Sequence, residues 1–406
     1  MTSGAAPRSF WNRDFLFGLF AYFFLFMAVS LFFLFPVVLE AFGPTKGRIG
    51  MIMGVHSVVA IAVRPFFGRV IDVRGGRRIA LLGLFILMAA VPLFHFVKDA
   101  GWAPFLLRAL TGMGWGMGMT ATIAACSDLA PADRLAKSMG VIGVAGLVAN
   151  ALGPLLAEEL LRSGGPGRLY NVSVLFLLAS LGCVLATREA ACPDEGGGGG
   201  GTNALKLLPW ALAAVVGSVP VFHGAIRGAM IYFIAVFGKS AGIERVGPFF
   251  VVFSVAAILT RFRLGDLSDR RGRKAVILPA ALIIAGNLFV IAEVRSFTLL
   301  MATGFVGGLG QGLIFPALST YIIDLLGRKN KGLAISLYNS LFDVGMGLGA
   351  PVFGWVSDQA GYRWMYRVAG LCLLLSTAVF MLKAPATEKK GKEGKRRGQT
   401  FKSLIF

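Results

Sequence analysis

Two pairs of polar residues interrupt long apolar stretches at a spacing of four. His223 and Arg227 lie in one apolar run, and Asn339 and Asp343 lie in another. Residues four apart share one face of an α-helix, so each pair would present its side chains together. A carboxylate in apolar surroundings can take up and release a proton, or it can form a fixed ion pair with a cation. We expect Asp343 to pair with Arg227, and both roles for Asp343 remain open.

Other apolar runs also carry polar side chains. Arg108 lies near the start of its run, where it either faces an internal cavity or extends its guanidinium to the surface. His56 is either a hydrogen-bonded interior group or part of a proton relay. Gln311, Asn150 and Tyr338 are polar residues that could line the same cavity as Asn339 and Asp343.

The elements that must position these residues are apolar helices. Of the 406 residues, 56% are hydrophobic and only 15% are charged, and the mean hydropathy is +0.75. A soluble domain carries about 25% charged residues, and a bilayer-spanning helix needs about 20 apolar residues. We expect an all-α polytopic membrane protein with twelve transmembrane helices. The expected spans are Asp14–Leu39, Arg48–Phe67, Arg78–Val97, Ala103–Cys126, Lys137–Leu161, Leu169–Thr187, Leu207–Phe237, Val246–Leu264, Ala275–Ala292, Thr298–Leu326, Gly332–Val356 and Trp364–Leu382.

The net charge of +20 follows the expected topology rather than a nucleic-acid partner. When both termini are placed on one side of the membrane, most of the Lys and Arg residues fall in loops on that side. Such an excess marks the cytoplasmic face. We therefore expect a multi-pass protein of the inner (cytoplasmic) membrane with both termini in the cytoplasm, and no nucleic-acid binding.

The chain divides into two bundles of six helices, residues 1–187 and 206–384. Between them, residues 188–205 include six consecutive glycines and are expected to form a flexible cytoplasmic linker. Residues 385–406 are rich in Lys and Arg and are expected to form a basic cytoplasmic tail.

One loop occurs in both halves of the chain. Residues 265–274 read GDLSDRRGRK, and residues 68–78, which begin 197 positions earlier, read GRVIDVRGGRR. A triplet of alternating glycines at 112–116 recurs at 308–312, a spacing of 196. A duplicated set of six helices, related by an axis along the membrane normal, accounts for this repetition.

The repeated loop resembles the signature Gly-x-x-x-Asp-Arg-x-Gly-Arg-Lys of the major facilitator superfamily. The second copy matches every fixed position, whereas the first has Val73 and Gly76 where the family has basic residues. The resemblance implies two pseudo-symmetric six-helix bundles and a loop that holds the cytoplasmic side closed. A turn that only anchors the topology is the alternative. The residues to which we assign this gating role are Asp72, Arg77, Arg78, Asp269, Arg270 and Arg273.

Two further motifs resemble patterns of the same superfamily. Arg108, followed by Gly112 and Gly114, resembles its Arg-x-x-x-Gly-x-Gly motif. Gly146 and the Gly153-Pro154 pair resemble the helix-5 motif of the antiporter, or efflux, branch, although the further glycines of that motif are absent. Close helix packing is the alternative explanation, because small residues let helices approach and proline kinks them.

The sequence carries no pattern typical of an enzyme or of a cofactor site. No Walker loop occurs, so ATP is not the expected energy source. The three histidines lie in separate runs, and the four cysteines have neither metal nor redox spacing. We expect no catalytic residue, no metal, no cofactor and no disulfide.

These observations favour a proton-coupled secondary transporter that works by alternating access and exports a small organic solute. The deep charges are mainly cationic and the first run has no internal acid, which favours an anionic or zwitterionic solute. Import of a carboxylate or similar nutrient by proton symport is the alternative, and a non-transporting membrane sensor or scaffold is a third possibility. The expected partners are the solute, protons and the lipid bilayer, and the expected state is a monomer.

Overall fold

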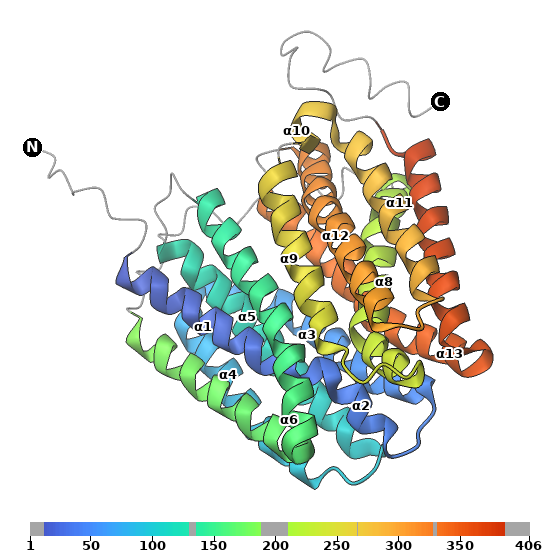
Figure 1. Ribbon diagram of the computed structural model, residues 1–406. Helices are drawn as coiled ribbons and strands as arrows, with labels where there is room; N and C mark the ends of the chain where they lie inside the picture. Colours follow the sequence, from blue (N-terminus) through green and yellow to red (C-terminus); the bar gives the residue numbers. More distant parts are fainter. Residues whose placement is uncertain (1–11, 130–134, 188–209, 266, 328–330, 386–406) are drawn as a thin grey trace, which may run out of the picture.

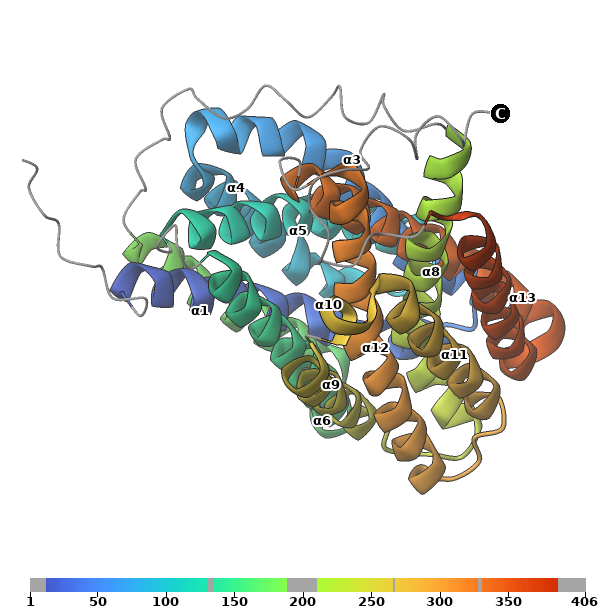
Figure 2. The ribbon, with the colours of Figure 1, turned by 90° about the horizontal axis from the view of Figure 1, so that it is seen from above.

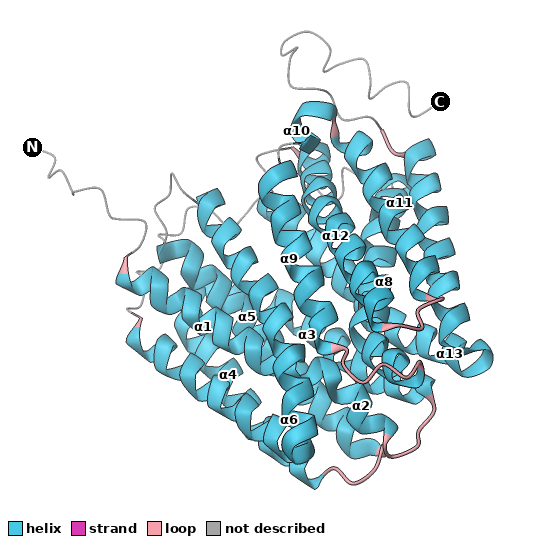
Figure 3. Cartoon of the chain, in the orientation of Figure 1, coloured by secondary structure: helices cyan, strands magenta, loops and turns pink. Residues whose placement is uncertain are grey.

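α-Helices make up nearly all of the chain that the structure describes. The structure is a computed structural model, and it describes residues 12–129, 135–187, 210–265, 267–327 and 331–385. No strand occurs within these ranges (Figure 3). The helices are α1 (Arg13–Ser30), η1 (Leu31–Leu34), α2 (Phe35–Glu40), α3 (Lys46–Arg74), α4 (Gly76–Leu93), η2 (Phe94–Phe96), α5 (Trp102–Leu129), α6 (Leu135–Ala186), α8 (Trp210–Ser240), α9 (Gly247–Leu264), α10 (Leu267–Arg271), α11 (Arg273–Ile291), α12 (Phe297–Leu326) and α13 (Lys331–Lys383).

The helices are long and apolar enough to cross a membrane. Nine helices in the described ranges meet this criterion by length and composition, and α5, with 28 residues, has a similar length. Large apolar side chains are exposed on their outer faces, for example Phe85 at 66% and Leu382 at 85%. Such exposure is unfavourable in water and expected in lipid. The prediction of an all-α polytopic membrane protein is confirmed, and the count of twelve spans stays a prediction.

The repeated loop forms the same turn in both copies. Gly75 separates α3 from α4 with φ 84°, and Gly272 separates α10 from α11 with φ 96°. This left-handed backbone region strongly favours glycine, because a Cβ would collide with the backbone there. The two glycines are 197 positions apart, which is the spacing of the loop repeat.

The last two expected spans of each half are continuous except at one residue. α6 has 52 residues and α13 has 53, and each contains a single non-helical glycine, Gly165 with φ 72° and Gly361 with φ 82°. The chain changes direction at these kinks (Figure 1). The expected linker at 188–205 and all but the first residue of the expected tail lie outside the described residues.

The helices gather in two groups, α1 to α6 and α8 to α13 (Figure 1). The groups meet along two helix pairs, α3 with α13 and α6 with α9, and the second pair lies side by side in Figures 1 and 2. We call the end of the bundle where α1 begins and α13 ends the terminal end. The opposite end, where α3 and α9 begin, is the distal end.

The repeated glycine triplets bring helices into close contact within each group. In α5, a Cβ on the first or third glycine of 112–116 would overlap the backbone of α3, and one on the second would overlap α4. In α12, the first and third glycines of 308–312 face α9 in the same way, and the second faces α11. Both groups therefore use one packing device at equivalent positions.

Candidate functional site

Asp343 lies at the junction of the two helix groups. Its carboxylate pairs with the guanidinium of Arg64, which α3 contributes from the first group. The side chains of Arg64 and Asp343 are 19% and 16% exposed, so the pair is enclosed by helices yet not sealed from its surroundings. Because the two charges belong to different groups, neutralising either one would weaken the junction and leave its partner unpaired in a largely apolar environment.

The predicted pairing of Asp343 with Arg227 is wrong, and helical periodicity gives the reason. Gly347 and Ala350 follow Asp343 at helical spacing, and both lie against the backbone of α3. Gly345, two residues after Asp343, lies against α8 instead. Asp343 therefore belongs to the stripe of α13 that faces α3, whereas Arg227 is carried by α8.

Arg227 takes part in a second contact between the groups. Its Nη2 donates to Oδ1 of Asn150 in α6 at 3.0 Å, and Nδ2 of Asn150 donates to Oγ of Ser254 in α9 at 3.1 Å. The Arg227 guanidinium also lies 4.4 Å from the centroid of the Phe253 ring. Its buried Nη1 has no hydrogen-bond partner in the described part of the chain. Arg227 is thus a buried cation that is held by an amide and an aromatic face.

His223 lies inside the second group. One ring nitrogen, Nε2, is 2.7 Å from Oε1 of Gln311 in α12, and the other, Nδ1, is 3.3 Å from the Tyr338 hydroxyl of α13. The side chain is only 1% exposed. Asn339, one turn before Asp343, is half-buried. His223, Gln311 and Tyr338 therefore form one hydrogen-bonded cluster that ties three helices together.

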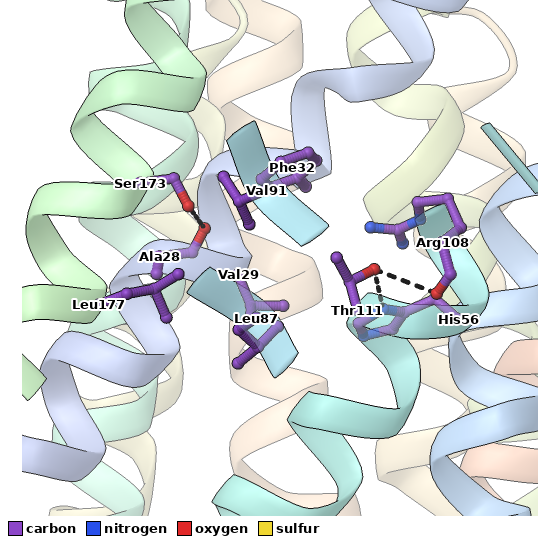
Figure 4. Close-up of a pocket in the computed structure, with 10 residues that line it drawn as sticks. All are labelled: Ala28, Val29, Phe32, His56, Leu87, Val91, Arg108, Thr111, Ser173 and Leu177. Carbon is purple, nitrogen blue, oxygen red and sulfur yellow. Dashed lines mark hydrogen bonds between the residues drawn. The ribbon is translucent and has the colours of Figure 1, made fainter. Parts of the chain in front are cut away.

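Arg108 and His56 share a separate small cavity in the first group (Figure 4). The Thr111 hydroxyl donates to the Arg108 carbonyl at 3.0 Å and lies 3.3 Å from Nδ1 of His56. The Arg108 guanidinium is 6.0 Å from the centroid of the Phe32 ring, and its Nε has no partner among the described residues. The cavity volume of about 10 Å³ has room for roughly one water molecule. An organic solute does not fit beside Arg108 in this conformation.

The sequence analysis missed two cations, Arg64 and Arg261. They are 197 positions apart, and the loop repeat could have revealed them. Arg261 lies near the end of α9, where its guanidinium is 5.2 Å from the centroid of the Phe315 ring. Its Nε is buried without a hydrogen-bond partner in the described ranges. The spacing of 197 was present in the sequence, but no acidic residue near either arginine pointed to a charged pair.

Two carboxylates join the groups at the distal end. Glu158 of α6 accepts backbone N–H groups at the start of α9, from Val246 at 2.6 Å and Gly247 at 2.9 Å. Asp358 of α13 accepts the N–H groups at the start of α3, from residues 46 and 47, both at 2.7 Å. A carboxylate at a helix N-terminus satisfies free donors and complements the helix dipole. The distal end is therefore closed by matched contacts between the groups.

The predicted gating residues lie at the terminal end. Arg273 pairs with Asp269 at 2.5 Å and with Asp324 at 2.8 Å, all within the second group. Arg77 donates from Nη2 to the Leu185 carbonyl at 2.9 Å within the first group. The side chains of Arg78 and Arg270 are exposed, and that of Asp72 lies outside what the structure describes. Their gating role stays a prediction.

The predicted helix-5 motif packs α6 against α1. A Cβ on Gly153 would overlap Ser30, and a Cβ on Gly146 would come within 2.8 Å of the Tyr22 hydroxyl. Pro154 is buried inside α6. These positions make close helix contact, which is the alternative that the sequence left open. Among the described residues, no group of three His, Cys, Asp or Glu side chains could hold a metal ion.

The family model of the Major Facilitator Superfamily matches residues 16–291 and 244–405. The matched residues cover most of the chain, and the chain belongs to this superfamily of membrane transporters. The resemblance drawn from the loop is confirmed. A small-molecule substrate and a bilayer environment follow from membership.

Curated relatives cover most of the chain at low identity. The staphylopine export protein of Staphylococcus aureus is 21% identical over 388 residues, which are 89% of this chain and 95% of that protein. The multidrug resistance protein MdtG of Enterobacter lignolyticus is 26% identical over 360 residues, 84% of each chain.

Solved structures of the same fold agree with the helix arrangement. The human organic anion transporter MFSD10 (TETRAN) has a TM-score of 0.67 at 19% identity and covers 91% of this chain and 99% of that one. A bacterial homolog of the human lysosomal transporter Spinster, solved in an inward-facing and unoccupied conformation, has a TM-score of 0.77 at 15% identity and covers 93% and 97%. At these identities the likeness shows the fold alone.

Proposed function

We propose that this transporter exports a small zwitterionic or anionic organic solute in exchange for protons, by alternating access across the cytoplasmic membrane. The observation that carries the proposal is the Arg64–Asp343 pair at the junction of the two helix groups. It places one acid and one base at the junction, within reach of solvent. Residues that bind substrate and coupling ion in this fold class lie at the interface of the repeats.

The ion pair has the chemistry needed to couple solute and proton. A zwitterion that enters the junction would place its ammonium on the Asp343 carboxylate and its acidic group on an arginine of the junction. A proton on Asp343 removes the charge that holds the ammonium. Proton and solute then compete for one carboxylate, and competition of this kind produces exchange rather than co-transport.

The names of two relatives support the outward direction. One is an export protein and another is a multidrug resistance protein. The cationic contacts between the groups support an acidic solute, because Arg227, which joins α8 to α6, has no acidic partner among the described residues. A solute with an acidic group would offset this charge, whereas a purely cationic solute would add to it.

Proton symport of a carboxylate is the second candidate, and the same ion pair favours it for one type of solute. An anion that lacks an ammonium group needs Arg64 alone. Protonation of Asp343 would release Arg64 for that anion, so proton and solute would bind together and move in the same direction. The sign of the coupled flux therefore depends on whether the solute carries a cationic group.

The remaining parts of the proposal concern orientation and partners. We assign the terminal end to the cytoplasm, because the basic loops gather there. With the distal end closed by Glu158 and Asp358, this structure would then be a state closed to the outside. The coupling ion is the proton, the helices contact lipid, and one copy of the chain is sufficient for transport.

The test uses purified protein in liposomes that contain a pH-sensitive dye, with an inward proton gradient and a panel of amino acids, carboxylates and quaternary amines. Wild type should couple proton entry to the exit of a zwitterion, and Asp343→Asn should abolish this proton flux. Glu159→Gln, which neutralises an exposed acid, is the matched control and should leave the flux unchanged. Proton flux that persists in Asp343→Asn would exclude Asp343 as the proton site.

A further inference from the structure

The two halves of the chain place an arginine at the same position. Arg64 of α3 and Arg261 of α9 are 197 residues apart, as are the turn glycines Gly75 and Gly272 that follow them. α3 meets α13 of the other group, and α9 meets α6 of the other group. The helix that faces Arg261 is therefore the counterpart of the helix that supplies Asp343 to Arg64.

The counterpart of Asp343 is not an acid. The residue 197 positions before Asp343 is Gly146, and α6 contains no acidic residue before Glu158. Arg261 instead faces Gly143, where an added Cβ would lie 3.5 Å from Nη1 of the guanidinium. Across the junction, Arg64 thus faces a carboxylate, whereas Arg261 faces a glycine that has no side chain.

No acidic side chain among the described residues pairs with Arg261. The Phe315 ring lies 5.2 Å from the guanidinium, and the buried Nε has no hydrogen-bond partner among the described residues. The Tyr22 hydroxyl lies beside Gly146, three residues after the Gly143 that faces Arg261. A guanidinium that lacks an acidic partner at membrane depth is costly unless a solute or water pairs with it.

We propose that Arg261 binds the acidic group, a carboxylate or a phosphate, of the transported solute. The acidic group takes the place at Arg261 that the Asp343 carboxylate has at Arg64. Arg261 supplies up to two parallel N–H donors to a planar acid. This inference rests on the proposed function, because it assigns the acidic end of the solute that the Arg64–Asp343 pair is proposed to exchange for protons.

Binding, measured without transport, tests this assignment. Thermal unfolding of purified protein would be recorded with a library of small metabolites sorted by whether they carry an acidic group. Compounds that raise the Tm of wild type should carry a carboxylate or phosphate, and Arg261→Gln should weaken their apparent affinity about 10- to 100-fold, the range for loss of a charged hydrogen bond. Arg263→Gln removes an exposed cation two residues away and should bind like wild type.

A second pair of variants separates a lost site from a damaged fold. Gly143→Asp would put a carboxylate beside Arg261, where the space permits a side chain, and should block acidic compounds. Gly143→Asn adds almost the same volume without the charge and should retain most of the binding. Arg261→Lys keeps the charge but loses the planar fork, so it should restore part of the affinity that Arg261→Gln loses.

The outcomes distinguish this assignment from the proposed function. Acidic compounds that bind Arg261→Gln as tightly as wild type, or an absence of acidic compounds among those that raise the Tm, would overturn the role of Arg261. If acidic compounds bind through Arg261 but no proton flux accompanies transport in liposomes, the role of Arg261 stands and proton exchange fails. If flux occurs and is unaffected in Arg261→Gln, the proton exchange stands and this assignment fails.

Discussion

The distal and terminal ends of the bundle are held by contacts of different kinds. At the distal end, the carboxylates of Glu158 and Asp358 cross between the helix groups and accept backbone N–H groups of the facing helices. At the terminal end, Arg273 pairs with Asp269 and Asp324 of its own group. The described contacts therefore join the groups at one end and brace a single group at the other.

This difference shows which contacts must break for the protein to change conformation. A carboxylate on a helix N-terminus requires two helices to approach within hydrogen-bond distance, so the contact is lost once they separate. An ion pair within one group moves with that group and survives. Opening the distal end must break the Glu158 and Asp358 contacts, whereas the pairs of Arg273 can persist or exchange partners.

Removing both distal carboxylates should have the largest effect on the opening of the distal end. Each helix cap contributes about 1 kcal/mol, so Glu158→Ala with Asp358→Ala should shift the population toward an open distal end by about 2 kcal/mol, roughly 30-fold. Ser57, whose hydroxyl lies 3.4 Å from that of Tyr232 across the junction, is the reporter position. A cysteine there, with the four native cysteines replaced, should react with maleimide correspondingly faster in lipid nanodiscs.

The control replaces the exposed neighbours Glu159 and Gln359 by alanine and should leave the labelling rate unchanged. Of the single variants, Glu158→Ala should act more strongly than Asp358→Ala, because Glu158 is buried and Asp358 is exposed. Equal labelling of the double variant and wild type would mean that the caps do not hold the distal end closed.

Arg273→Ala should have an intermediate effect that depends on the conformation. If the loop gates the terminal end, Arg273 stabilises the distal-open state as well as its own group. Adding Arg273→Ala to the double variant should then lower the labelling of the Ser57 cysteine about 2- to 5-fold, the range for an exposed ion pair. Arg271→Ala, an exposed neighbour, should not. A reduced Tm without any change in labelling would make Arg273 a brace and not a gate.

The Glu293–Arg367 pair should give the smallest effect, because it lies at an exposed loop within one group. Nη2 of Arg367 donates to the Glu293 carboxylate at 2.5 Å, and this hydrogen bond lowers the pKa of Glu293. A lowered pKa in the folded state means that the pair stabilises above the ordinary glutamate pKa of about 4.3 and loses its effect as the pH falls through the folded-state value. Glu293→Gln should therefore lower the Tm slightly at pH 7, and this difference should shrink as the pH falls below the ordinary glutamate pKa. A difference that stays constant with pH would contradict this account.

The repeat in the sequence predicted much of the fold. Gly75 and Gly272 adopt the same turn because the loop needs a left-handed residue at one position in each half. The glycine triplets of α5 and α12 pack against equivalent helices, because glycine lets the neighbouring backbones approach closely. Family membership followed from the loop, because its charges between apolar runs are specific in a chain of this composition.

The candidate site was predicted less completely. Asp343 was selected from its depth in an apolar run, but its partner was misassigned to Arg227 because the two runs lie in the same half of the chain. The face of α13 that carries Asp343 packs on α3 of the other group, and no local pattern reveals that. The distal carboxylates were also missed, because an acid near a helix end looks the same whether it caps a neighbour or faces water.

The sequence by itself determined the class of protein, because hydropathy, helix length and the repeated loop depend only on the order of residues along the chain. It also contained the equivalence of Arg64 and Arg261, in their spacing of 197. Only the tertiary structure decided which charges meet, that Asp343 reaches Arg64 and that Arg261 faces Gly143. Those contacts depend on how the helix groups formed by the two halves of the chain pack together. This packing is set by the shape of whole helix faces and not by the neighbours of a residue in the chain.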